Sequence, residues 1–144
     1  MGFSTVAATA IIGVAIVMAM EIIAGTTIPT ITDIHNSYDE MRERSIKQIQ
    51  TKINITNAVA VANGSNHHDL TFTVENTGSI SLKTSSFDVL INGTKKAFTC
   101  SKTYLYPEDQ AVFTLEYLDG RNGSNRLKIV TENGIEDYYT YTIP

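Results

Sequence analysis

The segment FSTVAATAIIGVAIVMAMEIIAG, residues 3–25, is the longest apolar stretch of the chain. It carries no charge from Phe3 to Met20, and Glu21 is the only charged residue before Asp33. As a helix it would be about 34 Å long, at roughly 1.5 Å per residue. The hydrocarbon core of a bilayer is roughly 30 Å thick. The segment is therefore typical of a helix that crosses a membrane once, with modest tilt.

Three alternatives compete with a membrane anchor. A cleaved secretory signal has a basic start and a shorter apolar core, whereas the first basic residue here is Arg42. The core helix of a soluble domain rarely stays uncharged over such a length. An apolar helix buried in a protein filament would have the same composition as a membrane anchor, so this third alternative stays open.

The composition limits the classes of function. The 144 residues carry a net charge of −4, with a pI near 5.3. This argues against a nucleic-acid partner and against strong attraction to anionic lipid head groups. The single cysteine, Cys100, excludes an intramolecular disulfide. Without residues 1–25, about 120 residues remain, which is enough for one domain and a connector.

Residues 26–50 form the predicted connector. The stretch from Gly25 to Pro29 is expected to end or kink the first helix, since proline lacks an amide donor. A second helical pattern follows, with apolar residues at Ile31, Ile34, Tyr38 and Met41. It predicts an amphipathic helical stalk. A coiled-coil seam and a helix lying on its own domain both fit this pattern.

Residues 51–144 change to the two-residue alternation of β-strands. About seven short strands, separated by turns such as Asn92-Gly93 and Asn133-Gly134, predict an all-β head with an immunoglobulin-like antiparallel β-sandwich fold. The first strand is expected to carry Ile53, Ile55, Val59 and Val61 on one face. The predicted core residues are Phe72, Val74, Val89, Ile91, Phe113, Leu115, Leu127 and Ile129.

Four N-x-S/T sequons are candidate N-glycosylation sites, at Asn54, Asn63, Asn92 and Asn122. Asn-Gly is also ordinary turn chemistry, so each site alone is weak evidence. Four sequons behind an apolar anchor predict that the head lies outside the cytoplasm.

No catalytic, cofactor or metal site is expected, and the sequence does not indicate an enzyme. His67-His68-Asp69 is a poor metal site because adjacent residues of a strand point to opposite faces. Cys100 has no neighbouring base that would make it a nucleophile.

The last predicted strand, Ile135 to Ile143, is a candidate edge strand. It carries Tyr138, Tyr139 and Tyr141, and tyrosine is favoured at protein interfaces. A free strand edge pairs readily with another chain. We therefore expect a homodimer through this edge, unless the tyrosines fill the last face of the core.

Two stretches carry a resemblance to a known family: residues 1–13, MGFSTVAATAIIG, and residues 70–78, LTFTVENTG. With one membrane helix and a sandwich, they resemble the archaellum accessory proteins FlaF and FlaG, and FlaF more closely. Archaellin and pilin precursors share an apolar N-terminal helix and a β-rich head, but carry a basic leader ending in glycine. Residues 1–2 do not resemble that leader.

The resemblance implies a single-pass protein of the archaeal cytoplasmic membrane, in the basal region of the archaellum, with its sandwich in the pseudo-periplasmic space. There it would bind S-layer protein and act as a stator for the motor. The implied partners are the S-layer protein, the motor's membrane platform with a related accessory protein, membrane lipid around the helix, and a second copy. The alternative is a filament subunit, a minor archaellin or pilin-like protein.

Overall fold

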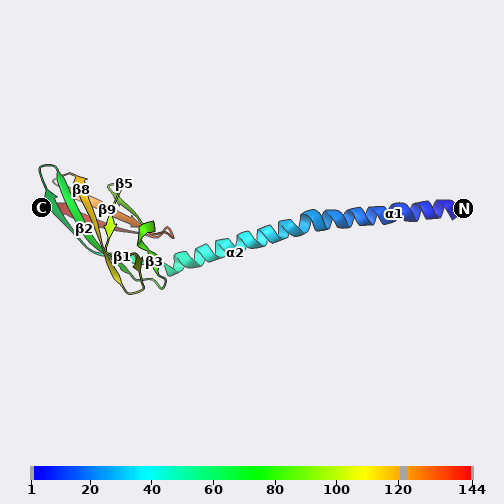
Figure 1. The fold of residues 1–144 in the computed structure, drawn as a ribbon, viewed down its shortest axis with the longest axis horizontal. Coiled ribbons are helices and arrows are strands. Elements are labelled where there is room, and N and C mark those ends of the chain that lie inside the picture. The colour runs from blue at the N-terminus through cyan, green and yellow to red at the C-terminus, as the bar shows by residue number, and fades with distance from the viewer. Residues whose placement is uncertain (1, 121–122, 144) are drawn as a thin grey trace. The chain divides into compact units, whose positions relative to one another are not determined.

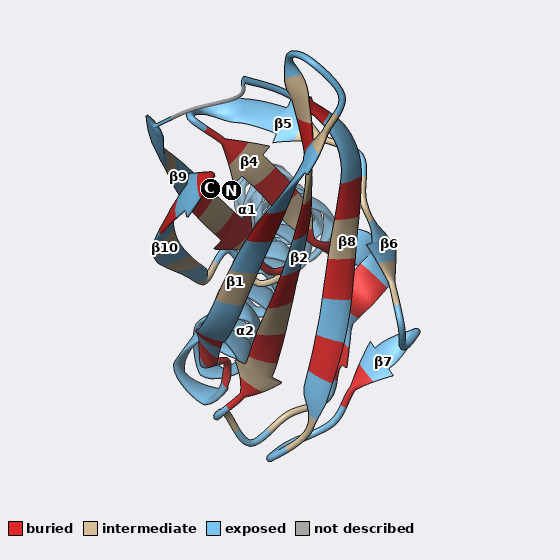
Figure 2. Ribbon diagram, turned by 90° about the vertical axis from the view of Figure 1, so that its left-hand side faces the viewer, coloured by how far each residue is buried: buried red, intermediate tan, exposed pale blue. Residues whose placement is uncertain are grey.

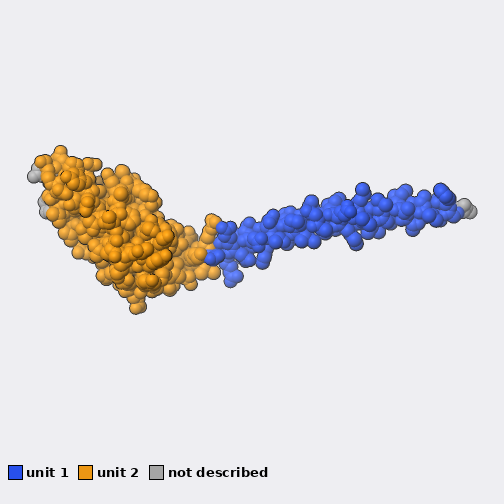
Figure 3. All heavy atoms as spheres, in the orientation of Figure 1, with its two compact units in different colours: residues 1–43 blue, residues 44–144 orange. Residues whose placement is uncertain are grey.

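The computed structural model describes residues 2–120 and 123–143. The chain divides into two compact units, residues 1–43 and residues 44–144, which Figure 3 shows in different colours. The first unit is helical. The second contains the last turns of the helix and all the strands (Figure 1).

The helix runs from Gly2 to Gln50 in three parts: α1 (Gly2–Ile22), the π-helical turn η1 (Ile23–Thr27) and α2 (Ile28–Gln50). Of the two outcomes expected between Gly25 and Pro29, the end of the helix is wrong, and the irregularity there is a π-helical turn. The backbone N–H of Ile28 donates to the carbonyl of Ile23, five residues back. Hydroxyls of Thr26 and Thr30 donate to backbone carbonyls four residues back, at 2.6 and 2.7 Å. Such local adjustments let a helix continue through a proline in lipid.

Ten strands make up the described head. They are β1 (Ile53–Asn63), β2 (His67–Asn76), β3 (Leu82–Lys83), β4 (Asp88–Ile91), β5 (Thr94–Lys96), β6 (Thr99–Cys100), β7 (Tyr104–Leu105), β8 (Gln110–Asp119), β9 (Gly123–Val130) and β10 (Glu136–Ile143). A short 3-10 turn, η2 (Thr84–Ser86), precedes β4.

The strands form a sandwich, as predicted. The first sheet has the order β1-β2-β8-β6, the second has the order β10-β9-β4-β5, and β3 pairs with β7. All pairings are antiparallel. Between β5 and β6 the chain leaves the second sheet at Lys96 and enters the first sheet at Thr99. The β3–β7 pair was not predicted.

The core between the sheets contains all eight residues predicted outside the first strand. Phe113 is its aromatic centre. The ring stacks on Phe72 with centroids 5.2 Å apart and on Phe87 at 5.9 Å, and Phe98 lies tilted at 5.4 Å. Aromatic pairs at such distances add to the stabilisation from buried area.

The first strand departs from the prediction at a β-bulge between Ile55 and Asn57. One extra residue reverses which side chains face the core. Ile53 and Ile55 are buried, whereas Val59 and Val61 are 51% and 63% exposed. The prediction that these two valines share one face of the strand with Ile53 and Ile55 is therefore wrong. Figure 2 shows β1, β2 and β8 side by side, with buried and exposed positions alternating along them.

The two sheets are linked to each other at both sides of the sandwich. On one side the chain itself crosses between the sheets through Ala97 and Phe98. On the other side β10 lies beside β1, and the backbone N–H of Ile55 donates to the Asp137 carboxylate at 2.7 Å. The edge of β10 is therefore covered over part of its length by a strand of its own chain.

The end of the helix is held against the base of the head. The backbone N–H groups of Thr77 and Ser79 donate to the carbonyls of Lys52 and Gln50, both at 2.9 Å. A Cβ on Gly78 would collide with the Gln50 carbonyl oxygen and would lie 2.6 Å from the Lys52 nitrogen. Only glycine allows this close approach. The connector and the head are thus joined by backbone contacts.

Candidate functional site

The helix is the first candidate site because its apolar side chains are exposed. Large apolar residues of α1 such as Ile11, Val17 and Met20 are more than half exposed, and α1 contains no buried residue. Among the described residues, one helix is long and apolar enough to cross a membrane. The N-terminal segment therefore fits a single-pass membrane anchor.

The described sequons differ in how their asparagines are used. Asn54 is exposed on β1. The Asn63 amide donates to the Asp69 carboxylate at 2.9 Å, and the Asn92 amide donates to Asn125 at 2.7 Å. The fourth predicted site, Asn122, lies outside the described residues. Asn54 is thus the described sequon whose side chain projects from a strand rather than stabilising a turn.

The three tyrosines of β10 have separate roles. Tyr138 is 40% exposed, and its ring lies under the guanidinium of Arg126, 4.3 Å from the ring centre. Its hydroxyl donates to Glu136 at 2.7 Å. Tyr139 packs against the core, and Tyr141 is buried. For Tyr141 the structure has the alternative that the sequence left open, a side chain in the last face of the core.

Tyr141 belongs to a buried polar network with His68. The Nδ1 of His68 lies 2.8 Å from the carbonyl of Gly120, so this nitrogen carries the proton and donates. Nε2 then accepts from the Tyr141 hydroxyl at 3.0 Å. Burial raises the pKa of Tyr141 to about 12. The network ties β2, β8 and β10 together at one end of the sandwich.

His67 and Asp69, the neighbours of His68 in sequence, make contacts outside this buried network. The His67 ring lies tilted against the ring of Tyr117, with centroids 5.2 Å apart, and 3.5 Å from the Asp119 carboxylate. Asp69 accepts from the Tyr117 backbone N–H at 2.9 Å. That bond, with the one from Asn63, lowers the pKa of Asp69. In the described part of the chain, no three metal-ligating side chains converge.

The two outward sheet faces differ in charge. The second sheet carries ion pairs between Lys95 and Asp88 and between Lys128 and Glu136, with Arg126 beside them. Hydrogen bonds with Glu136 and Tyr138 raise the pKa of Lys128, and the bond from Lys128 lowers that of Glu136. This outward face is thus ionic.

The middle of the first sheet's outward face has no charged side chain. Two adjacent rows cross its four strands, and we call these residues the uncharged face: Val59, Thr71, Thr114 and Thr99 in one row, and Asn57, Thr73, Val112 and Ser101 in the other. The sequence did not indicate this surface, because the bulge that exposes Val59 leaves no clear signal.

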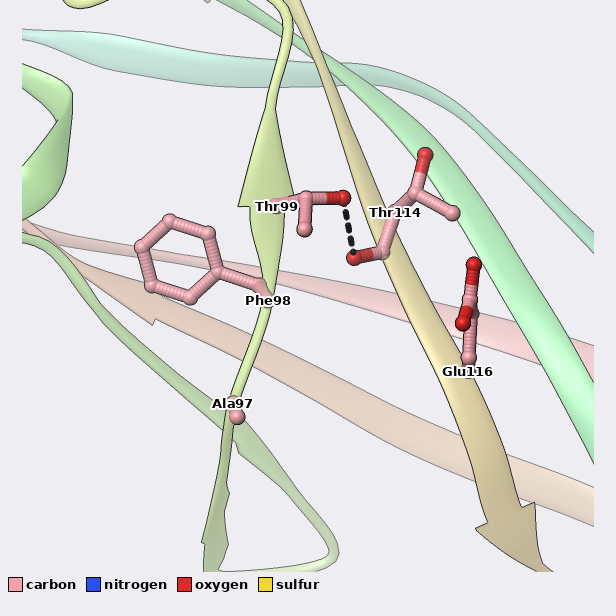
Figure 4. Close-up of a pocket in the computed structure, with 5 residues that line it drawn as sticks. All are labelled: Ala97, Phe98, Thr99, Thr114 and Glu116. Atoms are coloured by element: carbon pink, nitrogen blue, oxygen red, sulfur yellow. Dashed lines mark hydrogen bonds between the residues drawn. The ribbon is translucent and has the colours of Figure 1, made fainter.

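A shallow hollow of about 220 Å³ borders the uncharged face between β6 and β8. Figure 4 shows the Thr99 hydroxyl directed at the Thr114 carbonyl, 3.4 Å away, with Glu116 beyond it. Phe98 points away from these side chains, toward the core. The hollow presents hydroxyl groups and one carboxylate, and it is too open to enclose a small molecule.

Comparison with known proteins gives a family and a fold. The sequence profile named Archaeal-type flagellin matches residues 2–141. No curated protein matches the chain in a sequence search. The archaellum periplasmic stator protein FlaG from Sulfolobus acidocaldarius superposes with a TM-score of 0.53 at 18% identity, over 63% of this chain and 99% of FlaG.

The structure of the stator protein complex of FlaF and FlaG from the same organism gives a TM-score of 0.52 at 18% identity, over 63% of this chain and 89% of the matched chain. At this identity the match shows the fold of the head. Together with the profile, it confirms the resemblance to archaellum proteins of the FlaF and FlaG type. Because the profile covers nearly the whole sequence, the chain belongs to the archaeal-type flagellin family.

Proposed function

We propose that this protein is a non-enzymatic archaellum component that ties the motor to the cell envelope. Its helix would anchor it in the cytoplasmic membrane, with lipid around α1, and its head would bind S-layer protein outside that membrane. The observation that carries the proposal is the continuous helix that ends in backbone contacts with a head of the FlaG and FlaF fold. A stator must resist torque. The backbone hydrogen bonds between the end of the helix and the head support that role.

The proposed partners follow from the same arrangement. A structure of FlaF in complex with FlaG exists, which supports an accessory partner of similar fold. The motor's membrane platform would lie beside the helix. We also propose self-association of the heads and an N-glycan on Asn54, the exposed sequon on β1.

Co-sedimentation tests the envelope contact. The full chain in lipid nanodiscs is mixed with isolated S-layer sheets, and empty nanodiscs serve as the control. Saturable sedimentation of the chain with the sheets is expected. Sedimentation equal to that of empty nanodiscs would contradict the proposed S-layer contact.

A filament subunit is the second candidate, because the family match is to flagellins. The exposed apolar side chains of α1 would then pack in a fibre core instead of lipid. Mechanical shearing of cells separates the two functions. A stator component stays with the membrane fraction, whereas a filament subunit leaves with the sheared filaments.

A further inference from the structure

The first sheet has two ends, and the helix contacts one of them. β1 begins at Ile53, shortly after the helix, and runs for 11 residues to Asn63. At roughly 3.3 Å per residue, the two ends of this strand lie on the order of 30 Å apart. β2 returns from His67 and ends beside the contacts that Thr77 and Ser79 make with the end of the helix. The end of the sheet at Asn63 and His67, which we call the far end, is therefore the end opposite the helix.

Tyr117, at the far end, combines an exposed side chain with a strained backbone. It is the most exposed of the large apolar residues in the described head, at 68%. Its φ is +56°, a conformation that a bulky side chain adopts only at a cost. The other described non-glycine residues with positive φ, Asn92 and Glu108, lie in turns, whereas Tyr117 lies inside β8. Strained residues persist where the surrounding structure enforces them, and they cluster at functional sites.

Neighbouring strands hold Tyr117 in this conformation. The pairing of β2 with β8 has an irregular register at this point. One oxygen of the Asp69 carboxylate accepts from the backbone N–H of Tyr117, and the other accepts from the Asn63 amide, both at 2.9 Å. The ring of His67 lies against the ring of Tyr117, with centroids 5.2 Å apart. Bulges re-aim side chains beside functional sites, and this irregularity presents an aromatic ring in a fixed position on the surface.

The charges around Tyr117 are mostly acidic. The described strands of the first sheet, β1, β2, β8 and β6, contain no lysine or arginine. Three acidic residues of these strands lie toward the far end: Asp69, Glu116 and Asp119. Lys96, from β5 in the other sheet, lies 3.8 Å from the Asp119 carboxylate. A partner with complementary charge would therefore carry basic side chains.

We propose that the far end of the head is the surface that contacts S-layer protein, with Tyr117 as its anchor. The assignment rests on the proposed stator function and gives that function a contact surface. A tyrosine ring that is already held in place loses little freedom on binding, and tyrosine is enriched among the residues that dominate binding energy at interfaces. Val61, which is 63% exposed and pairs with Asp69, extends the apolar surface onto β1. The partner surface offers an apolar socket for the ring, with basic side chains opposite Glu116 and Asp119.

Co-sedimentation of two tyrosine variants tests the assignment. The full chain in lipid nanodiscs is titrated with isolated S-layer sheets. Tyr117→Asn removes the ring, and asparagine tolerates the left-handed backbone, so the variant should fold. Tyr106→Asn is the matched control, because Tyr106 is 58% exposed in the turn whose Glu108 N–H donates to the carbonyl of Asn76, at the helix end of the head. We expect Tyr117→Asn to raise the half-saturating concentration about tenfold or more, and Tyr106→Asn to leave it unchanged.

The outcomes separate this assignment from the stator function. Wild-type chain that does not sediment with the sheets would contradict the S-layer contact itself. Equal sedimentation of the wild type and Tyr117→Asn would overturn only the assignment to the far end. Near-ultraviolet circular dichroism verifies that the variants fold.

The salt dependence of binding provides a second readout, which does not require a change at Tyr117. Salt screens the attraction between the acidic far end and a basic partner, so wild-type binding should weaken as the salt concentration rises. Glu116→Gln should bind more weakly at low salt and depend less on salt. Glu75→Gln, at the helix end of the same sheet, is the control and should keep the wild-type dependence. An unchanged salt dependence in Glu116→Gln would contradict a basic partner surface. Loss of wild-type binding in an excess of glycans released from the sheets would identify a carbohydrate ligand and contradict the protein contact.

Discussion

Asn76 shows at the residue scale why a polar side chain is kept inside the head. It is fully buried, and its amide donates to the carbonyls of Ile80 at 2.8 Å and Leu105 at 3.0 Å. Its side-chain oxygen accepts from the Gly78 N–H at 3.0 Å. All hydrogen-bonding groups of this amide therefore have partners, as buried polar groups require. Asn76 thus fastens the stretch 70–78 to β7 and to the base of the head.

Replacing this amide by a carboxylate should strongly destabilise the head. Asn76→Asp has nearly the same shape, but it puts a negative charge against two carbonyl oxygens and removes both donors. We expect a loss of about 2 kcal/mol or more in the free energy of unfolding. Thermal melting of the full chain in detergent, followed by near-ultraviolet circular dichroism, measures it. Asn54→Asp, at an exposed position, is the control, and equal melting of the two variants would refute the role of Asn76.

The raised pKa of Tyr141 makes stability depend on alkaline pH. Below pH 10 the hydroxyl is protonated in the folded and unfolded states alike. Above pH 10 the unfolded chain loses this proton first, because the folded-state pKa is about 12. Stability should therefore fall between about pH 10 and 12, by up to roughly 2–3 kcal/mol from this group.

Melting of the full chain at a series of alkaline pH values checks this expectation. Tyr141→Phe removes the ionisable group, so its melting temperature should fall less steeply above pH 10 than that of the wild type. Tyr138→Phe, at a half-exposed position on the same strand, is the matched control and should keep the wild-type slope. An unchanged slope in Tyr141→Phe would show that Tyr141 does not control the alkaline transition.

At the scale of elements, regular alternation was predictable from the sequence and irregular backbone was not. Phe72 and Val74, like Leu127 and Ile129, occupy alternating positions and are buried as expected. The bulge after Ile55 shifts the rest of β1 by one residue. The amino-acid composition of a strand does not indicate such a shift, so the sequence could not predict it. Pro29 correctly indicated where the helix is irregular. The irregularity is a π-helical turn and not a break in the helix.

The surfaces were less predictable than the core. Asn54, Asn63 and Asn92 could be found as sequons, but their different hydrogen bonds depend on tertiary contacts. The sequence left Tyr141 open between an interface and a core position, because its partner, His68, lies 73 residues away in sequence. The uncharged face combines four strands, so no local pattern could reveal it.

The joint between helix and head gives a prediction at the same scale. Gly78→Ala adds a methyl group where the Gln50 carbonyl and the Lys52 nitrogen leave no room. We expect the last turn of α2 to detach from the head, with faster hydrogen exchange of the Thr77 and Ser79 amides. Gly64→Ala is the control, since a Cβ there meets no atom and only the positive φ opposes it. Unchanged exchange at both amides would contradict this role of the joint.

For the whole molecule, the chain consists of a helix that ends at Gln50 and a β-sandwich head, and hydrogen bonds from Thr77 and Ser79 to the Lys52 and Gln50 carbonyls join the two. This order of parts is the one that the proposed stator function requires. The two stretches that resemble FlaF and FlaG lie in different parts of this arrangement. Of the first stretch, residues 2–13 belong to α1, and residues 70–78 form most of the central strand β2 and the turn that contacts the end of α2.

The location of the head outside the cytoplasmic membrane is central to the proposed function, and impermeant thiol labelling tests it most directly. Thr140→Cys in the Cys100→Ser background places one exposed thiol on the head. Spheroplasts without S-layer are treated with a membrane-impermeant maleimide before and after lysis. Equal labelling is expected in both samples, because an external head is accessible without lysis. Labelling only after lysis would place the head in the cytoplasm and contradict the stator function.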